Sequence, residues 1–314
     1  MERLNHTDME EFMLLGLTDV SELQIFLFII FLLFYLFNIL GNISIVTLII
    51  IDYTLHKPMY FFLGNLSFLD FFYSTTTVPK MLSGLLIGDK SISLTGCVAQ
   101  LHFFHFLGST EALLLTSMSY DRYAAICYPL QYHLLMARTV CCQLAISCWL
   151  IGFLYSLSQT IITFRLPYCG IRQVRHFYCD IKPVLKLACA NTQMSQLIMS
   201  ATFTLVAVST LTLIIISYMF ISSHVLNIKS SRDRRKVFST CTSHLTVVFL
   251  YIGTALITYL GPSTDNSLHQ DRISAILVTV ITPALNPLIY SLRNTEVKRA
   301  IEKIYLRTLN FIRD

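Results

Sequence analysis

Hydrophobic residues occupy long stretches of this chain, each long enough to cross a lipid bilayer. A helix needs about 20 residues to span the hydrocarbon core, and five stretches without Asp, Glu, Lys or Arg reach that length. Two more are broken by one acid each, Asp70 and Glu111. The pattern predicts seven transmembrane helices, near residues 25–51, 58–85, 97–123, 140–164, 196–224, 237–260 and 272–292.

Composition agrees with this pattern. The chain is 54% hydrophobic and only 13% charged, whereas soluble domains have about 25% charged residues. No internal repeat and no pair of matching halves is visible, so we expect one domain. The expected fold is an all-α membrane protein, with a seven-transmembrane helix bundle over 25–292, an N-terminal segment over 1–24 and a C-terminal segment over 293–314.

The distribution of charge predicts the orientation in the membrane. With the N-terminus outside, 14 of the 23 Lys and Arg residues fall on the inner side, as the positive-inside rule requires. Asn5 begins an Asn-His-Thr glycosylation sequon in the N-terminal segment. Residues 1–22 lack the apolar core of a cleavable signal peptide, so the first helix is expected to direct insertion. We expect a multi-pass protein with an extracellular N-terminus and a cytoplasmic C-terminal segment.

The nine cysteines divide according to this topology. Four fall on the outer side, where disulfides form, and five lie in the membrane or at the inner face. Four cysteines allow three pairings, and their spacing does not choose among them. The outer four are Cys97, Cys169, Cys179 and Cys189.

Four polar residues interrupt the predicted helices at a similar depth. Asn42, Asp70, Glu111 and Asn286 lie about 10 to 18 Å from the inner ends of their helices, at a rise of 1.5 Å per residue. Such groups are costly in lipid and face the bundle interior. Two neighbouring carboxylates cannot both be ionised unaided, so one retains a proton, or Na⁺ lies between them. The alternative is a pair of hydrogen-bonded structural acids.

The predicted third helix presents one continuous strip to the bundle. Small residues alternate with larger ones along it, which favours an apolar cavity with a few orienting polar groups. Close helix packing is the alternative for the small residues. The strip consists of Phe104, His105, Gly108, Ser109, Glu111 and Ala112.

Basic and apolar residues alternate at helical spacing after Asn294. This pattern predicts a short amphipathic helix lying on the anionic inner leaflet. Its apolar positions are Val297, Ala300, Ile301 and Ile304.

Four long motifs closely resemble signature segments of the odorant receptors, a branch of the rhodopsin-like G-protein-coupled receptors. The Asp121-Arg122-Tyr123 triplet and the Asn286-Pro287 pair, with Asn42 and Asp70, are typical of the wider class. The four motifs are KPMYFFLGNLSFLD (57–70), SMSYDRYAAICYPLQY (117–132), KVFSTCTSHL (236–245) and PALNPLIYSLRN (283–294).

The resemblance implies an odorant receptor that binds small, mainly apolar volatile ligands within the helix bundle. It also implies the disulfide pairs Cys97–Cys179 and Cys169–Cys189. The implied ligand-binding residues are Phe104, His105, Gly108, Ser109, Ala112, Thr202, Val206, Ile252, Leu256, Tyr259 and Thr279.

The resemblance further implies coupling to a stimulatory heterotrimeric G protein that raises cyclic AMP. Ligand would shift a pre-existing equilibrium between receptor states, since His105 and Arg122 are roughly 25 Å apart along the helix. The implied coupling and activation residues are Asp121, Arg122, Tyr123, Tyr218, Lys236, Asn286, Pro287 and Tyr290. Ile252 replaces the family's tyrosine on helix 6, with Tyr251 one position earlier, which suggests fewer polar groups in the pocket.

Other functions have less support from the residues. His102 and His105 are spaced to share a metal, but a third ligand is missing. A proton- or ion-coupled transporter could use Asp70 and Glu111 as a relay, yet the expected repeats are absent. No HExxH or GxSxG motif indicates an enzyme. Residues 272–292 contain no lysine for a retinal Schiff base, and no cofactor is expected beyond a possible Na⁺ at Asp70 and Glu111.

Overall fold

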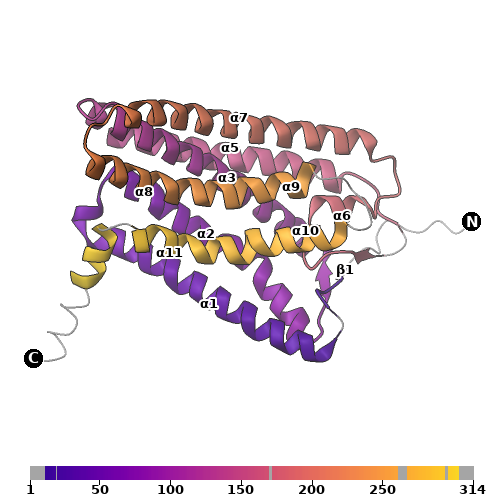
Figure 1. Ribbon diagram of the computed structural model, residues 1–314. Coiled ribbons are helices and arrows are strands. Elements are labelled where there is room, and N and C mark those ends of the chain that lie inside the picture. Colours follow the sequence, from indigo (N-terminus) through magenta and orange to yellow (C-terminus); the bar gives the residue numbers. More distant parts are fainter. Residues whose placement is uncertain (1–10, 19, 170–171, 261–266, 294–295, 304–314) are drawn as a thin grey trace, which may run out of the picture.

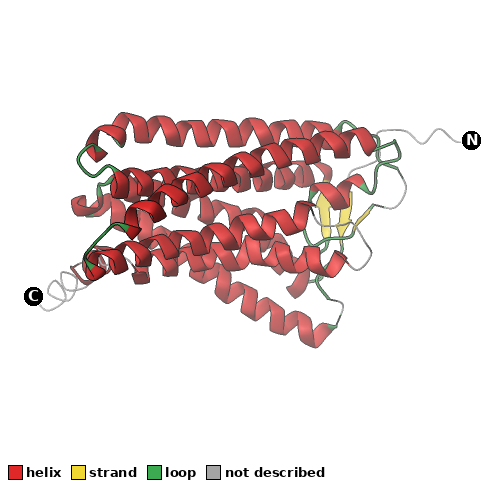
Figure 2. Cartoon of the chain, turned by 45° about the horizontal axis from the view of Figure 1, so that its top comes forward, coloured by secondary structure: helices red, strands yellow, loops and turns green. Residues whose placement is uncertain are grey.

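Seven long helical units lie side by side as one bundle in this computed structural model, within the residues that it describes (Figure 1). The described residues are 11–18, 20–169, 172–260, 267–293 and 296–303. A small sheet closes one end of the bundle, called here the sheet end (Figure 2). The first five units are α1 (Ser21–Ile51), α2 (Pro58–Leu86), α3 (Leu94–Cys127), α5 (Arg138–Phe164) and α7 (Gln193–Leu226).

The last two units each contain a π-helical segment. The sixth consists of α8 (Ser231–Val248), η2 (Phe249–Gly253) and α9 (Thr254–Leu260). The seventh consists of α10 (Ser267–Ile276), η3 (Leu277–Ile281) and α11 (Thr282–Arg293). A π-helical turn holds more residues than an α-helical turn, so each segment changes which side chains face the bundle. The bundle of seven helices is the one that the hydrophobic pattern predicts.

The third helix occupies the middle of the bundle. It packs against α2, α5, α7 and α8. Among the described residues, five segments are long and apolar enough to cross a membrane by length and composition: α1, α5, α7, 241–259 and 271–290. The more polar α2 and α3 bury their acids, since Asp70 and Glu111 are fully buried. Burial in the bundle therefore compensates for the lower hydropathy of these two helices.

The sheet end is organised by the N-terminal strand β1 (Glu11–Leu14). It pairs antiparallel with β2 (Ser91–Ser93) and parallel with β3 (Gln173–Val174). Phe12 and Leu14 are buried beneath it. The loop after β3 continues into the short helix α6 (Ile181–Leu185). The sequence pattern did not predict this strand, because it is only four residues long.

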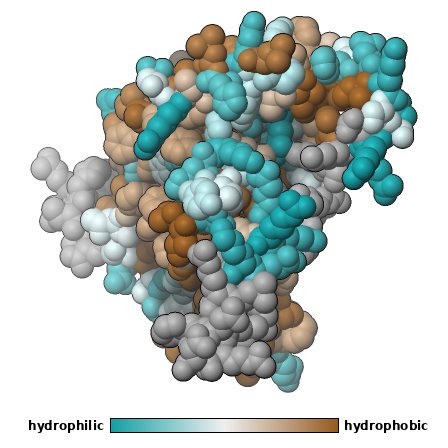
Figure 3. All heavy atoms as spheres, turned by 90° about the vertical axis from the view of Figure 1, so that its left-hand side faces the viewer, coloured by the Kyte–Doolittle hydropathy of each residue, from teal (hydrophilic) through white to brown (hydrophobic). Residues whose placement is uncertain are grey.

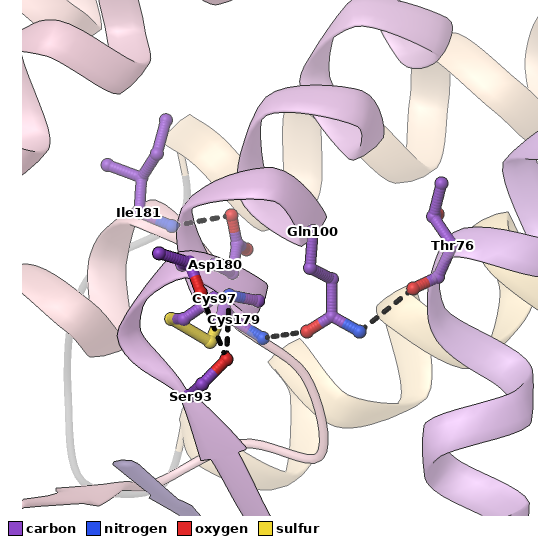
Figure 4. The surroundings of a disulfide bond; sticks show 9 residues. Thr76, Ser93, Cys97, Gln100, Cys179, Asp180 and Ile181 are labelled. Atoms are coloured by element: carbon purple, nitrogen blue, oxygen red, sulfur yellow. Dashed lines mark hydrogen bonds between the residues drawn. A yellow bond between two sulfur atoms is a disulfide. The ribbon is translucent and has the colours of Figure 1, made fainter. Parts of the chain in front are cut away.

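Two disulfide bonds tie the loop of the sheet end to its neighbours. Cys97 at the start of α3 is bonded to Cys179, and Cys169 is bonded to Cys189. Of the three possible pairings, the structure has the one that the family resemblance implies. Gln100 supports the first bond, since its side chain accepts from the backbone N–H of Cys179 and donates to the carbonyl of Thr76 (Figure 4).

The opposite end, called here the α4 end, carries η1 (Tyr53–Leu55), α4 (Tyr132–Leu135) and a helix over 296–303. Lys57 lies 2.8 Å from Glu296, and Lys303 lies 3.3 Å from Asp52. Val297 is buried against the bundle. The helix predicted after Asn294 is therefore present and docked on the bundle, although Ile304 lies outside the described residues.

Candidate ligand cavity and coupling site

An apolar cavity lies between the helices near the sheet end. This inner cavity contains about 760 Å³ of space between atoms and is lined from α2, α3, α5, α7, η2, α9, α10 and η3. All the ligand-binding residues implied by the resemblance line it except Thr202 and Thr279.

Thr202 and Thr279 face other helices. Thr202 accepts a hydrogen bond of 2.7 Å from Gln159 of α5, and the stripe of α7 that reaches the cavity lies one position further along, at Phe203, Val206 and Ala207. Thr279 is fully buried and donates to the carbonyl of Ala275 within its own helix. These two residues were expected to line the cavity, and the structure places them outside its lining.

Adjacent residues of η2 both face the cavity. Tyr251 and Ile252 both line it, as neighbouring pairs of α3, α7 and α9 also do. The hydroxyl of Tyr251 donates a 2.7 Å hydrogen bond to the carbonyl of Gly108. A tyrosine thus contacts the third helix despite the substitution at Ile252, and the cavity has more polar groups than the sequence suggested.

Asp180 forms the polar cap of the cavity. Its carboxylate lies 3.1 Å from Nε2 of His105 and accepts hydrogen bonds from Tyr259 and from the backbone N–H of Ile181. Burial raises the pKa of Asp180, but the hydrogen bond and charge of His105 outweigh this, and the pKa lies below its ordinary value. Asp180 is therefore an ionised acceptor that joins the loop to α3 and α9.

Asp180 was not among the site residues predicted from the sequence, although a signal for it existed. It directly follows Cys179, and the bond from Cys179 to Cys97 places it above α3 (Figure 4). His102, considered as a metal ligand with His105, faces Ser156 and Thr160 of α5 instead. No group of three or more metal-binding side chains occurs among the residues that the structure describes.

Of the four polar residues predicted to form one layer, Asn286 and Asp70 are hydrogen-bonded to each other, and Asn42 bonds to Asn38 and to the carbonyl of Pro283. Asn286 donates to Oδ2 of Asp70 at 2.8 Å, and Asn42 donates to Oδ1 of Asn38 at 2.6 Å. Glu111 is close enough for its charge to interact with that of Asp70. Both oxygens of Glu111 and one oxygen each of Asn42, Asp70 and Asn286 have no hydrogen-bond partner among the described residues.

These oxygens are the kind of ligand set that a small hard cation takes. Carboxylate and amide oxygens suit such ions, and buried oxygens without partners are otherwise costly. The residues therefore fit Na⁺, with Asp70 and Glu111 supplying the charge. A proton shared between the two carboxylates remains the alternative for the same geometry.

Asp121 and Arg122 point to different partners at the α4 end. Asp121 accepts a 2.7 Å hydrogen bond from Tyr132 of α4. The charge of Arg122 acts on Tyr218, His244 and Tyr290, and its Nε atom has no hydrogen-bond partner among the described residues. Asp121 is thus held by the loop helix, whereas Arg122 lies near the ends of α7, α8 and α11.

His244 joins three helices beside Arg122. Its Nε2 atom lies 3.0 Å from the carbonyl oxygen of Leu115 on α3, and its Nδ1 atom lies 2.9 Å from the hydroxyl of Tyr218 on α7. The side chain is fully buried. His244 was overlooked in the sequence because it lies within a motif that was considered only as a whole.

The remaining coupling residues lie around this point. The ring of Tyr123 packs against Tyr128 and Phe220, and a Cβ atom on Gly41 would come within 3.2 Å of Pro287. The surface of the α4 end is rich in hydrophilic side chains (Figure 3). Arg232, Arg234 and Arg235 at the start of α8 are exposed. The side chain of Lys236 and the whole of Asn5 lie outside the described part of the chain.

Known proteins with similar sequences cover nearly the whole chain. The family model described as "Olfactory receptor" matches residues 31–308. Olfactory receptor 12D1 of Homo sapiens is 49% identical over 98% of this chain and 96% of its own length. Olfactory receptor 8U9 of Mus musculus is 47% identical over 97% of both chains. With its bundle of seven membrane helices, the chain therefore belongs to the olfactory receptor family of G-protein-coupled receptors.

Proposed function

We propose that this receptor binds small, mainly apolar odorants in the inner cavity and activates a stimulatory heterotrimeric G protein that raises cyclic AMP. In this proposal it lies in the plasma membrane with the sheet end outside and the α4 end in the cytoplasm. Residues 25–292 form the receptor domain, with an extracellular segment before it and a cytoplasmic helix and tail after it.

The inner cavity is the main observation that supports this proposal. Its lining is dominated by aromatic and aliphatic side chains such as Phe104, Val206 and Leu256, which favour hydrocarbon. A few polar groups also line it, among them His105, Ser109 and Tyr259, and these could orient a ligand. An odorant with a hydrocarbon body and one polar group fits this distribution.

The α4 end supports coupling to a G protein. Arg122 is partly exposed there, and the arginines of α8 add positive charge to the same surface. An outward movement of α8 would separate His244 from Leu115 and change the surroundings of Arg122. A ligand that binds the moved state more tightly would increase its population.

Two pairs of variants test the cavity and the coupling site separately. Val206→Phe fills the cavity, and we expect it to raise the odorant concentration for half-maximal response by about tenfold or more. Val208→Phe, on the exposed side of the same helix, is the matched control. Arg122→Ala should abolish the cyclic AMP response, whereas exposed Arg138→Ala at the same end should retain it.

The amount of each variant at the cell surface must be measured by surface labelling. Normal cyclic AMP signalling by Arg122→Ala at normal surface levels would contradict the coupling role. Equal responses from Val206→Phe and Val208→Phe would contradict the assignment of the ligand site.

A further inference from the structure

A second chamber lies beside the inner cavity at the sheet end. This outer chamber is lined by α3, α5, α6, α7 and α9, and the space between its atoms is about 1100 Å³ when its open mouth is included. Its wall toward the inner cavity is shared, because His105, Tyr155, Phe203 and Tyr259 line both. A ligand in the outer chamber is therefore separated from the inner cavity by side chains alone.

Gln159 gives the outer chamber a buried hydrogen-bond acceptor. Thr202 donates its only hydroxyl hydrogen to the carbonyls of Ile198 and Met199, so it can only accept from Gln159. The Nε2 atom of Gln159 must therefore face Thr202, where it lies 2.7 Å from Oγ1. The Oε1 atom of Gln159 therefore takes no part in the hydrogen bond to Thr202.

The Oε1 atom of Gln159 has no hydrogen-bond partner among the described residues, and the side chain is fully buried. A buried acceptor without a partner costs free energy that a donor group on a ligand would recover. Gln159 lines the outer chamber and not the inner cavity. The side chain that lacks a donor therefore belongs to the lining of the outer chamber, and a ligand must displace neighbouring side chains slightly to reach its Oε1 atom.

The lysines around the chamber interact with other groups of the protein. Lys182 donates from Nζ to the carbonyl of Thr258 at 2.5 Å, which occupies one of its hydrogens. Asp271 lies close enough for its charge to interact with both Lys182 and Lys186. The positive charge of the lysines is therefore partly balanced, while Leu185 and Met199 supply apolar lining.

We propose that the outer chamber is a second binding site, for neutral small molecules that carry a hydroxyl group, such as alcohols and phenols. The hydroxyl donates to Oε1 of Gln159, and the hydrocarbon part lies along Leu185, Met199 and Phe203. The site adjoins the inner cavity through the shared wall and thus deepens the proposed function, on which it rests.

Protection of an introduced thiol tests this site without a signalling readout. Ser200 is exposed at the chamber lining, so Ser200→Cys can be labelled with a methanethiosulfonate reagent. The probes are straight-chain primary alcohols and their methyl ethers, which have the same hydrocarbon part and lack the donor. Unsubstituted receptor measures labelling of the native cysteines.

We expect a saturating alcohol to slow the labelling of Cys at position 200 by up to about tenfold more than its ether does, the contribution of one hydrogen bond. Adding Gln159→Met should remove this difference, whereas Gln143→Met, exposed on the same helix, should not. The difference should persist in Val206→Phe, which fills only the inner cavity. A binding measurement with the alcohol and the Gln159→Met receptor gives the same comparison if the introduced thiol impairs folding.

Equal protection by alcohol and ether, or a difference that survives Gln159→Met, would overturn the proposal. Loss of the difference in Val206→Phe would assign the hydroxyl to the inner cavity and overturn it as well. A receptor that shows protection but no cyclic AMP response would instead contradict the proposed function, so the two failures are distinguishable.

Discussion

The Nε2 atom of His105 lies 3.1 Å from Oδ1 of Asp180, so the central helix is joined to the loop that covers the inner cavity. The hydroxyl of Tyr259 reaches the same carboxylate at 3.2 Å. Asp180 is 4% exposed, which excludes most of the competing water. One carboxylate thus fixes the loop, α3 and α9 relative to one another.

Asp180→Ala should destabilise the receptor by about 1–3 kcal/mol, because His105 and Tyr259 lose a buried partner. The melting temperature of purified receptor in detergent would measure this. Asp180→Asn retains an acceptor and should be less harmful. Exposed Asp89→Ala is the matched control, since its partner Lys80 lies at the surface. Equal melting temperatures for Asp180→Ala and Asp89→Ala would show that the cap is not stabilising.

The hydrophobic pattern was sufficient for the helices, because the length of a span and the burial of its apolar side chains follow from local sequence. Contacts that join distant segments were harder to predict from the sequence. Asp180 could have been placed from the Cys97–Cys179 pair, but its contact with Tyr259 depends on how α9 is rotated. Thr202 and Thr279 were misplaced for the same reason: one step in helical rotation moves a side chain to a different neighbour.

The π-helical segments are a second feature that the pattern could not reveal. Both η2 and η3 lie within apolar runs whose composition is compatible with regular helix. The paired exposure of Tyr251 and Ile252 to the cavity depends on tertiary packing rather than on local preference. Most of the ligand-binding residues that the family motifs imply line the inner cavity, since such motifs reflect that packing.

Acidification should weaken the loop through His176. Burial, opposed by the charge of Asp180 and assisted by the positive charge of Arg272, lowers the pKa of His176 from 6.5 to about 4. The folded receptor keeps this ring neutral while the unfolded chain takes up a proton below pH 6.5. Stability is therefore complete above that pH and falls until about pH 4, by up to about 3 kcal/mol.

Melting temperatures of purified receptor between about pH 7 and about pH 5 would show this slope. His176→Gln should flatten it, whereas His133→Gln, exposed on α4, should not. The pKa of Asp180 lies below its ordinary 3.8, so its stabilising contribution is lost only at more acidic pH. A slope unchanged by His176→Gln would assign the effect to another group.

Sodium should lower the potency of agonists if it binds at Asp70 and Glu111. A cation held between α2, α3 and α11 would stabilise the resting arrangement of these helices, so agonist binding would have to displace it. Replacing Na⁺ by a large organic cation in the medium should then increase potency. Glu111→Gln should make potency independent of Na⁺, and exposed Glu302→Gln should leave the dependence intact. Identical sodium dependence in the Glu111→Gln receptor would favour a shared proton.

His244→Phe should raise the basal cyclic AMP level. The imidazole joins α8 to Leu115 on α3 and to Tyr218 on α7, and phenylalanine keeps an aromatic ring, somewhat larger, while removing both hydrogen bonds. Each lost hydrogen bond contributes about 1 kcal/mol, so the population with α8 moved outward should increase by about tenfold or more. His224→Phe, exposed near the end of α7, provides the control. Basal signalling equal to that of the control, at equal surface levels, would mean that this link does not hold the resting state, and movement of α8 would then depend on the packing around Ile221 and Cys241 instead.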